Sequence, residues 1–277
     1  MYSAFAGGAI GVQAKFEEAA ELAAHFGFEG IYLDLDHLMK DGAESVVYML
    51  EERGLRAAGW NLPVRLLGEQ AEFDRGLAKL RAIAEACSAA RALRCTTWVP
   101  PASNDRPRRE MFNFLVERLT PVCQILGDND VRLGLEFIGP ATSRAGKKYE
   151  FIYTMDGMLE VCRAVGTGNV GLLVDAWHLY TSGGQMDDVL NLTDDEVVGV
   201  HINDAPAGVA REAQIDNVRR LPGETGVIDA RRFLRCLQAI DYSGPVMMEP
   251  FDERLKAMEP KEAIKKAKDA LDSVWPD

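Results

Sequence analysis

Short apolar runs alternate with longer amphipathic segments along the whole chain. The longer segments carry apolar residues at helical spacing; in KFEEAAELAAHF, for example, Phe16, Ala19, Ala20 and Ala23 lie on one side of a helix. The short runs are typical of buried strands, so we predict strands within residues 3–10, 30–35, 55–63, 94–100, 131–139, 170–178, 197–204 and 244–251. We predict one helix after each strand, within residues 15–26, 42–53, 69–92, 112–126, 156–165, 185–192, 231–240 and 261–274.

Strict alternation of strands and helices predicts a parallel sheet covered by helices. Eight such repeats favour closure into a (β/α)8 TIM barrel over an open doubly wound sheet, which usually has fewer strands and a glycine-rich phosphate turn after the first one. The stretch AGGAIGVQ contains glycines but not the G-x-G-x-x-G pattern of that turn. No linker or low-complexity tract interrupts the sequence, so we predict a single α/β barrel domain over residues 1–277.

Four of the predicted strands end in side chains that commonly bind metals or move protons. In a TIM barrel the active site lies at the carboxyl ends of the strands, so these side chains should meet at one mouth of the barrel. A single acid at a strand end is often only a helix cap or a loop hydrogen-bond partner, but four successive strands with such residues indicate a site. The four residues are Glu136 in RLGLEFIG, Asp175 in GLLVDAWH, His201 in VGVHIND and Glu249 in VMMEPF.

Alternation along each strand tests whether these side chains can point into the barrel. If Glu136 points inward, so does Gly134, and if His201 points inward, so does Gly199. These small interior residues should leave room beneath the site. The residues then expected to face the helices are all apolar: Leu133, Leu135, Phe137, Val198, Val200, Ile202, Val246 and Met248.

Three carboxylates that converge on one point repel each other and raise one another's pKa values unless a positive charge lies between them. A divalent cation resolves this repulsion, and three oxygens with one imidazole nitrogen form a plausible ligand set. The nitrogen disfavours Ca²⁺ and leaves Mn²⁺, Co²⁺, Zn²⁺, Fe²⁺ and Mg²⁺ open. We predict one bound divalent metal ion, with Mn²⁺ as the first choice.

The order of these residues resembles a known family. A Glu on strand five, D-x-x-H on strand six, a His on strand seven, then R-x-x-P-G and a Glu on strand eight resemble the xylose isomerase-like barrels over nearly the whole sequence. The closer similarity is to the sugar phosphate isomerase/epimerase group, which includes ketose 3-epimerases, hydroxypyruvate isomerases and inosose-processing enzymes. Here the D-x-x-H motif runs from Asp175 to His178, and the R-x-x-P-G motif runs from Arg219 to Gly223.

The resemblance implies a role for each matching residue. Glu136 and Glu249 would be the catalytic acid–base pair beside the reacting carbon of the substrate. His178 would hold a substrate oxygen, and Arg219 would contact the substrate near the reacting centre. The ligands of the metal would be Glu136, Asp175, His201 and Glu249.

One loop departs from the pattern of the ketose 3-epimerases. These enzymes tend to have a further acidic substrate contact six residues after the first Glu, where Thr142 stands in this sequence. The same loop carries Arg144, Lys147 and Lys148 instead. One interpretation is that the three cations bind an anionic or larger substrate. The alternative is that they belong to a solvated basic loop.

Three of the four tryptophans, Trp60, Trp98 and Trp177, lie at predicted carboxyl ends of strands. Aromatic faces at a barrel mouth suit the C–H side of a sugar, whereas the alternative is that the rings fill space between strands and helices. We predict Trp60 and Trp98 to be substrate contacts and leave Trp177 open between the two roles.

The site chemistry suits proton transfer next to a carbonyl group. Removal of such a proton produces an enediolate, whose negative charge a divalent metal stabilises as a Lewis acid. Return of the proton gives an isomerase or an epimerase, and loss of a β-leaving group gives a lyase or dehydratase. We therefore predict a metal-dependent isomerase or epimerase for a sugar, sugar phosphate or keto-polyol, with a lyase acting on a keto-sugar or inosose as the alternative.

Composition narrows the class of protein further. A net charge of −12 and a pI near 4.9 argue against nucleic-acid partners, including damaged DNA, the substrate of endonucleases in the same barrel superfamily. No apolar run is long enough to span a membrane, and the N-terminus lacks the pattern of a signal peptide. The five cysteines, odd in number and without a C-x-x-C pair, indicate reduced, packed thiols. We expect a cytoplasmic enzyme with a small sugar-like substrate. Dimers and tetramers are common in the resembled group, so we expect one of these oligomeric states here. The remaining alternative is a binding protein with a degenerate site.

Overall fold

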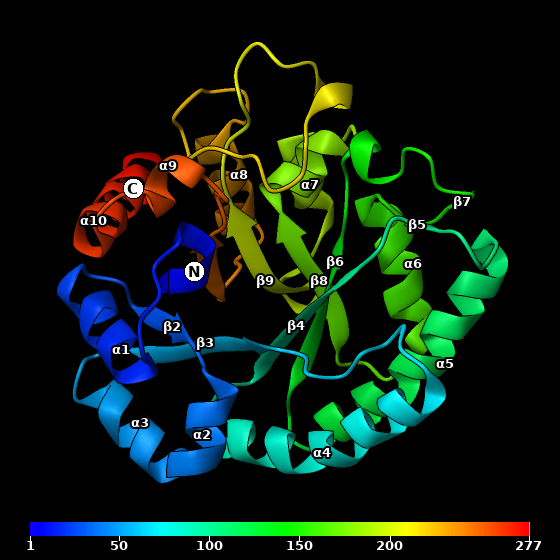
Figure 1. The fold of residues 1–277 in the computed structure, drawn as a ribbon, viewed down its shortest axis with the longest axis horizontal. Coiled ribbons are helices and arrows are strands. Elements are labelled where there is room, and N and C mark those ends of the chain that lie inside the picture. Colours follow the sequence, from blue (N-terminus) through cyan, green and yellow to red (C-terminus); the bar gives the residue numbers. More distant parts are fainter. Residues whose placement is uncertain (277) are drawn as a thin grey trace.

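In the computed structural model, which describes residues 1–276, eight parallel strands form a closed barrel with helices arranged around it (Figure 1). This confirms the predicted TIM barrel; Asp277, the last residue of the predicted domain, lies outside the described residues. Around the barrel the strand order is β1-β10-β9-β8-β6-β4-β3-β2. These strands are β1 (Tyr2–Phe5), β2 (Gly30–Tyr32), β3 (Arg56–Asn61), β4 (Arg94–Val99), β6 (Arg132–Phe137), β8 (Val170–Asp175), β9 (Val197–Ile202) and β10 (Pro245–Met248).

The helices that follow the strands agree with the predicted segments in most places. The predicted helix over 42–53 is present at Ala43–Glu51, and an additional helix at Leu35–Asp41 precedes it; Gly42, with a φ of 83°, separates the two. A further short helix, α7, directly follows β8, before the predicted segment 185–192. The α-helices are α1 (Phe16–His25), α2 (Leu35–Asp41), α3 (Ala43–Glu51), α4 (Gln70–Ala89), α5 (Arg108–Gly127), α6 (Met155–Val165), α7 (Ala176–Thr181), α8 (Ala230–Ala239), α9 (Glu253–Lys256) and α10 (Pro260–Val274).

Short elements occupy several of the connecting loops. An antiparallel pair of two-residue strands joins the loop after β4 to the loop after β6. Short 3-10 helices lie in other loops, and the longest loop, residues 203–229, connects β9 to α8. These elements are β5 (Ala102–Ser103), β7 (Tyr149–Glu150), η1 (Gly7–Ile10), η2 (Ala141–Ser143), η3 (Met186–Asn191), η4 (Asp194–Glu196) and η5 (Arg211–Ala213).

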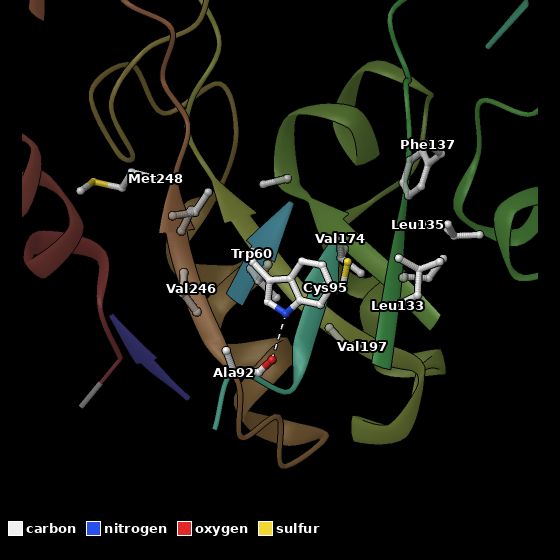
Figure 2. Close-up of a cluster of buried hydrophobic side chains, with 14 of the residues drawn as sticks. Trp60, Ala92, Cys95, Leu133, Leu135, Phe137, Val174, Val197, Val246 and Met248 are labelled. Carbon is white, nitrogen blue, oxygen red and sulfur yellow. Dashed lines mark hydrogen bonds between the residues drawn. The ribbon is translucent and has the colours of Figure 1, made fainter. Parts of the chain in front are cut away.

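The main hydrophobic core lies between the outer face of the barrel and the helices. Leu133, Leu135 and Phe137 project from one side of β6 into this core, as the predicted alternation requires (Figure 2). Val246 and Met248 do the same from β10. The residues between them on each strand are thereby directed to the interior of the barrel.

The prediction that Val198 faces the helices is wrong. The pairing of β8 with β9 shifts register between Leu172 and Leu173, which inserts one extra residue in β9 and turns Val198 inward. A Cβ atom on Gly134 would lie 3.0 Å from the Cβ of Val198, and one on Gly199 would lie 3.1 Å from Cδ1 of Leu173. Neighbouring side chains therefore fill the space at both predicted interior glycines, and no open space is left there beneath the site.

The prediction that Trp60 contacts substrate is also wrong. Its side chain is fully buried among core residues outside the barrel, and its Nε1 donates to the carbonyl oxygen of Ala92 at 2.9 Å (Figure 2). The next residue, Asn61, has the opposite orientation: its Oδ1 accepts from Thr96 Oγ1 at 3.4 Å, and the residue is exposed. Asn61, and not Trp60, is the side chain that β3 presents to the barrel mouth.

None of the helices within residues 1–276 is both long enough and apolar enough to cross a membrane. All five cysteines lie within this range, and each is buried and free. The prediction of packed, unpaired thiols is thereby confirmed.

Candidate active site

Four side chains from neighbouring strands meet at the carboxyl end of the barrel. One ligand atom from each of Glu136, Asp175, His201 and Glu249 lies within 4.8 Å of the other three. The Nδ1 atom of His201 is 3.2 Å from Glu136 Oε1, 3.3 Å from Glu249 Oε2 and 4.0 Å from Asp175 Oδ2. The structure therefore brings together the four residues that the strand ends pointed to.

Several polar atoms of this cluster are buried without a well-oriented hydrogen bond among the described residues. They are Oε1 of Glu136 and both ring nitrogens of His201, although Oε1 and Nδ1 lie 3.2 Å apart. Burial of an unpaired polar atom is costly, and a convergence of three carboxylates with an imidazole needs a positive charge. Three oxygens and one nitrogen suit a divalent transition metal, so the residues fit the cation that the sequence predicts.

Asp175 combines two roles that the sequence left as alternatives. Its Oδ1 accepts from the backbone N–H of Trp177 at 2.8 Å and caps the N-terminus of α7. Its Oδ2 faces His201 and the other carboxylates. Helix α7 begins at Ala176, so the backbone turns directly after Asp175 and thereby brings His178 back to the site.

The structure identifies Asn203 as a further site residue, which the sequence pattern did not reveal. It lies just beyond the end of β9, is fully buried, and donates from Nδ2 to Asp175 Oδ1 at 3.0 Å. Together with the N–H of Trp177, this amide fixes the rotation of the Asp175 carboxylate. The only signal in the sequence was its position two residues after His201.

Replacement of Asn203 by Ala should weaken metal binding by at least about tenfold, because groups that orient metal ligands typically contribute 10–100-fold in affinity. Isothermal titration of the metal-free protein with Mn²⁺ measures this. Asn191→Ala, in the 3-10 helix η3, provides the control. Equal affinities of Asn203→Ala and the control would contradict the role assigned to Asn203.

Arg219 reaches this cluster from the loop between β9 and α8 and is only 1% exposed. Its Nη1 donates to Asp175 Oδ2 at 2.8 Å and to Glu249 Oε2 at 2.9 Å. Its guanidinium lies near the rings of Trp177 and Phe251, whose centroids are 5.4 and 4.8 Å from Cζ. Trp177, which is fully buried, therefore packs against this arginine.

The protonation pattern of His178 follows from its contacts. The backbone N–H of Gly139 donates to Nδ1 at 3.2 Å, which favours the tautomer with the ring proton on Nε2. This Nε2 is 3.2 Å from Nη2 of Arg219, which is also a donor. His178 Nε2 also lies 3.8 Å from Asp175 Oδ2. The Nε of Arg219 has no acceptor among the described residues. The imidazole and the guanidinium therefore form the donor side of the cluster.

The two glutamates lie in different electrostatic surroundings. Burial raises the pKa of Glu136, although His201 opposes this shift. Burial would also raise the pKa of Glu249, but the charges of His201 and Arg219 outweigh it and lower the value to about 2. The difference arises because Arg219 is in contact with Glu249 and not with Glu136.

Comparison with known proteins identifies the family. Residues 20–274, which include all four clustered side chains, match the xylose isomerase-like TIM barrels. The chain belongs to this family. The resemblance drawn from the strand-end residues is thereby confirmed.

Two solved structures and one curated relative show how the chain compares with other proteins of this kind. A xylose isomerase domain protein from Alicyclobacillus acidocaldarius has 28% identity and a TM-score of 0.86, with 96% of this chain and 95% of that one covered. The IOLI protein with a bound zinc atom shares the fold at 20% identity and a TM-score of 0.82, with 99% and 98% covered. The inosose isomerase of Halalkalibacterium halodurans is 29% identical over 170 residues, which is 60% of this chain and 56% of that relative. The chain thus matches little more than half the length of this relative.

In this xylose isomerase-like barrel, the basic loop after β6 does not direct its cations to the site. Arg144 donates to the carbonyl oxygens of Gly139 and Pro140, at 2.6 and 3.2 Å, and stacks on Tyr153. Lys147 and Lys148 are exposed, and the Nζ of Lys148 lies 4.9 Å from the centroid of the neighbouring Tyr149 ring. Of the two alternatives, the structure favours a solvated loop whose arginine holds the loop together.

Thr142 stands where ketose 3-epimerases tend to have a further acidic substrate contact, but here its side chain bonds to another loop. Its Oγ1 donates to the carbonyl oxygen of Gln214 at 2.8 Å and so joins the loop after β6 to the long loop after β9. Gln214 is itself buried and donates to the carbonyl oxygens of Pro206 and Val209. This position therefore has a structural contact within the family fold.

Trp98 remains a candidate substrate contact. It is paired in register with Glu136 on the neighbouring strand, so both side chains project from the same side of the sheet. It is 61% exposed, which is unusual for a tryptophan, and it forms one wall of a cavity of about 410 Å³ between the loop after β3 and the end of β4. An exposed aromatic face therefore stands at the mouth of the barrel beside the cluster.

Proposed function

We propose that this protein is a divalent-metal-dependent isomerase or epimerase of a sugar or keto-polyol, which works by proton transfer through an enediolate. The observation that carries the proposal is the arrangement of Glu136, Asp175, His201 and Glu249 beside the imidazole of His178 and the guanidinium of Arg219. Such a site offers carboxylates for proton transfer on one side and donors for a substrate oxygen on the other.

Each group of residues has a distinct task in this reaction. A metal held by the four clustered side chains would supply Lewis-acid stabilisation of the developing negative charge. Glu136 and Glu249 take the proton from the substrate carbon and return it. His178, protonated on Nε2, and Arg219 donate to a substrate oxygen and hold the reacting carbon between the two glutamates.

The surroundings of the site favour an uncharged substrate. Arg219 is already matched by carboxylates, and Arg144 is paired with Glu150 and bonded to backbone oxygens, so neither has a free charge for a phosphate. The similarity to inosose isomerase, an enzyme named for a neutral keto-polyol, supports the same choice. We therefore propose an inosose or a related neutral keto-sugar as the substrate class.

The ligand set supports several divalent metals, and we propose Mn²⁺ first. Three carboxylates and one imidazole suit Mn²⁺, Co²⁺, Fe²⁺ and Zn²⁺. Zn²⁺ takes second place because the IOLI protein of the same fold holds zinc.

The deciding experiment is a screen of inososes, keto-sugars and aldoses in D₂O, with metal-free protein and after addition of Mn²⁺ or Zn²⁺. The proposal expects a product of unchanged mass that gains deuterium at one carbon, only when metal is present. A product lighter by one water would replace the proposal by the lyase alternative. Full activity of metal-free protein would exclude the proposed metal-dependent reaction.

Substitution of the two predicted aromatic contacts should separate their roles. Trp98→Ala should raise KM about tenfold, because the exposed ring is proposed to cover the apolar face of the substrate. Trp60→Phe should leave KM unchanged and lower the thermal stability, because Trp60 is a core residue bonded to Ala92. Steady-state kinetics and thermal unfolding of both variants measure these effects; a normal KM for Trp98→Ala would remove Trp98 from the site.

A further inference from the structure

Asp216 lies three residues before Arg219 in the loop between β9 and α8 and forms an ion pair with it. Its Oδ1 accepts from Nη2 of Arg219 at 2.9 Å. A buried guanidinium is stable only where its charge and its N–H groups are matched. Three carboxylates match the charge of Arg219, and Asp216 is the one that does not belong to the metal cluster.

The two amino groups of Arg219 have different partners. Nη1 contacts Asp175 Oδ2 and Glu249 Oε2, the same oxygen atoms that face His201 within the cluster. Nη2 lies 3.2 Å from His178 Nε2, which does not accept in the tautomer that the Gly139 N–H favours. Asp216 supplies the only oxygen acceptor of Nη2 among the described residues.

Loss of this acceptor would change where the guanidinium rests. Arginine prefers to bind carboxylates through two parallel N–H···O bonds, and Asp175 and Glu249 are the carboxylates within its reach. Without Asp216, Nη2 would turn toward them as well, and the full positive charge of Arg219 would act on two metal ligands. A cation at the cluster would then compete with the guanidinium for the same oxygens.

We propose that Asp216 is a positioning residue that holds the second amino group of Arg219, Nη2, away from the metal ligands, so that only Nη1 contacts Asp175 and Glu249. The negative charge of Asp216 balances part of the charge of Arg219, so Asp175 and Glu249 keep more of their own charge for a divalent cation. This inference rests on the proposed function, because it requires that the cluster binds a metal.

The test measures Mn²⁺ affinity of metal-free protein by isothermal titration. Asp216→Ala should bind Mn²⁺ about tenfold more weakly than wild type, in the range expected for groups that support metal ligands. Asp216→Asn keeps an acceptor oxygen but loses the charge, so its Mn²⁺ affinity should lie between those of wild type and Asp216→Ala. The same variant replaces Asp216→Ala in the test if Asp216→Ala does not fold. Asp128→Ala, which removes an exposed partner of Arg81 after α5, at the other end of the barrel, should match wild type.

A second experiment, in a variant that lacks Arg219, separates positioning of Arg219 from a direct effect of the Asp216 charge on the metal. Arg219→Met removes the group that Asp216 is proposed to hold, and methionine fills the space near the two rings. In this background Asp216→Ala should change Mn²⁺ affinity by less than about twofold, so the two substitutions are strongly coupled. An equal loss with and without Arg219, or wild-type affinity of Asp216→Ala, would overturn the inference. Absence of Mn²⁺ and Zn²⁺ binding by wild type would instead overturn the proposed function and this inference with it.

Discussion

Replacement of Glu249 by Gln should lower kcat by about 10³-fold, within the range known for loss of a positioned acid–base group. The amide keeps the shape of the side chain, but it cannot take a proton from carbon and it carries no charge. It would also remove one of the carboxylates that balance Arg219 and His201. The same variant should therefore bind Mn²⁺ at least about tenfold more weakly, because a ligand is lost together with its charge.

The measurement combines steady-state kinetics with a metal titration and a thermal unfolding curve. Glu253→Gln, on α9, is the matched control, because Glu253 is close in sequence and contacts only the exposed Lys256 among ion-pair partners of the described residues. Saturating Mn²⁺ should restore occupancy of the site in Glu249→Gln without restoring turnover. Turnover within tenfold of wild type under these conditions would rule out Glu249 as a catalytic residue.

Replacement of Gly139 by Ala should destabilise the protein and lower kcat/KM by about 10²-fold. A Cβ atom at this position would lie 2.2 Å from the carbonyl oxygen of His178, 2.5 Å from Thr181 Oγ1 and 2.8 Å from the N atom of Ser182. Two of these atoms belong to backbone, so the loop must move away from α7. That movement breaks the bond from the Gly139 N–H to His178 Nδ1, which sets the position of the ring proton.

The expected cost combines overpacking, about 1–3 kcal/mol, with a buried hydrogen bond lost, about 1–3 kcal/mol. For a protein of this size, a total of about 2–6 kcal/mol corresponds to a fall in Tm on the order of 5–20 °C. The loss of activity follows from misplacement of His178, since shifts of about 1 Å can cost 10²-fold in rate. Gly8→Ala is the control, because a Cβ atom there meets nothing within 4 Å. Wild-type kinetics for Gly139→Ala would show that His178 does not depend on this loop.

The barrel and its four clustered side chains could be predicted because both depend on local patterns. Each strand carries its own alternation of apolar and polar residues, and the end of a parallel strand always lies at the same mouth of the barrel. Glu136, His201 and Glu249 therefore had to meet once the strands closed. On β6 and β10, every residue that the alternation predicted to face the helices does so.

Other positions could not be predicted because they depend on register between strands or on contacts between distant loops. β3 carries no acid or histidine at its carboxyl end to mark its inward face, so the pattern alone favours Trp60, whereas Asn61 faces the mouth. The register shift between β8 and β9 turned Val198 inward, and a bulge leaves no clear mark in the pattern of one strand.

The amino-acid pattern is thus sufficient for the closed barrel, the level of the site and the residue types that a divalent cation requires. Only packing in three dimensions shows how these residues are held in place. Asn203 donates a hydrogen bond to Asp175, the N–H of Gly139 donates one to His178, and Asp216 accepts one from Arg219. Two of these contacts join residues 28 and 39 positions apart, and all three depend on hydrogen-bond directions at loop ends. Such directions are set by the packing of loops against one another after the barrel closes, and no periodicity of a single segment encodes them.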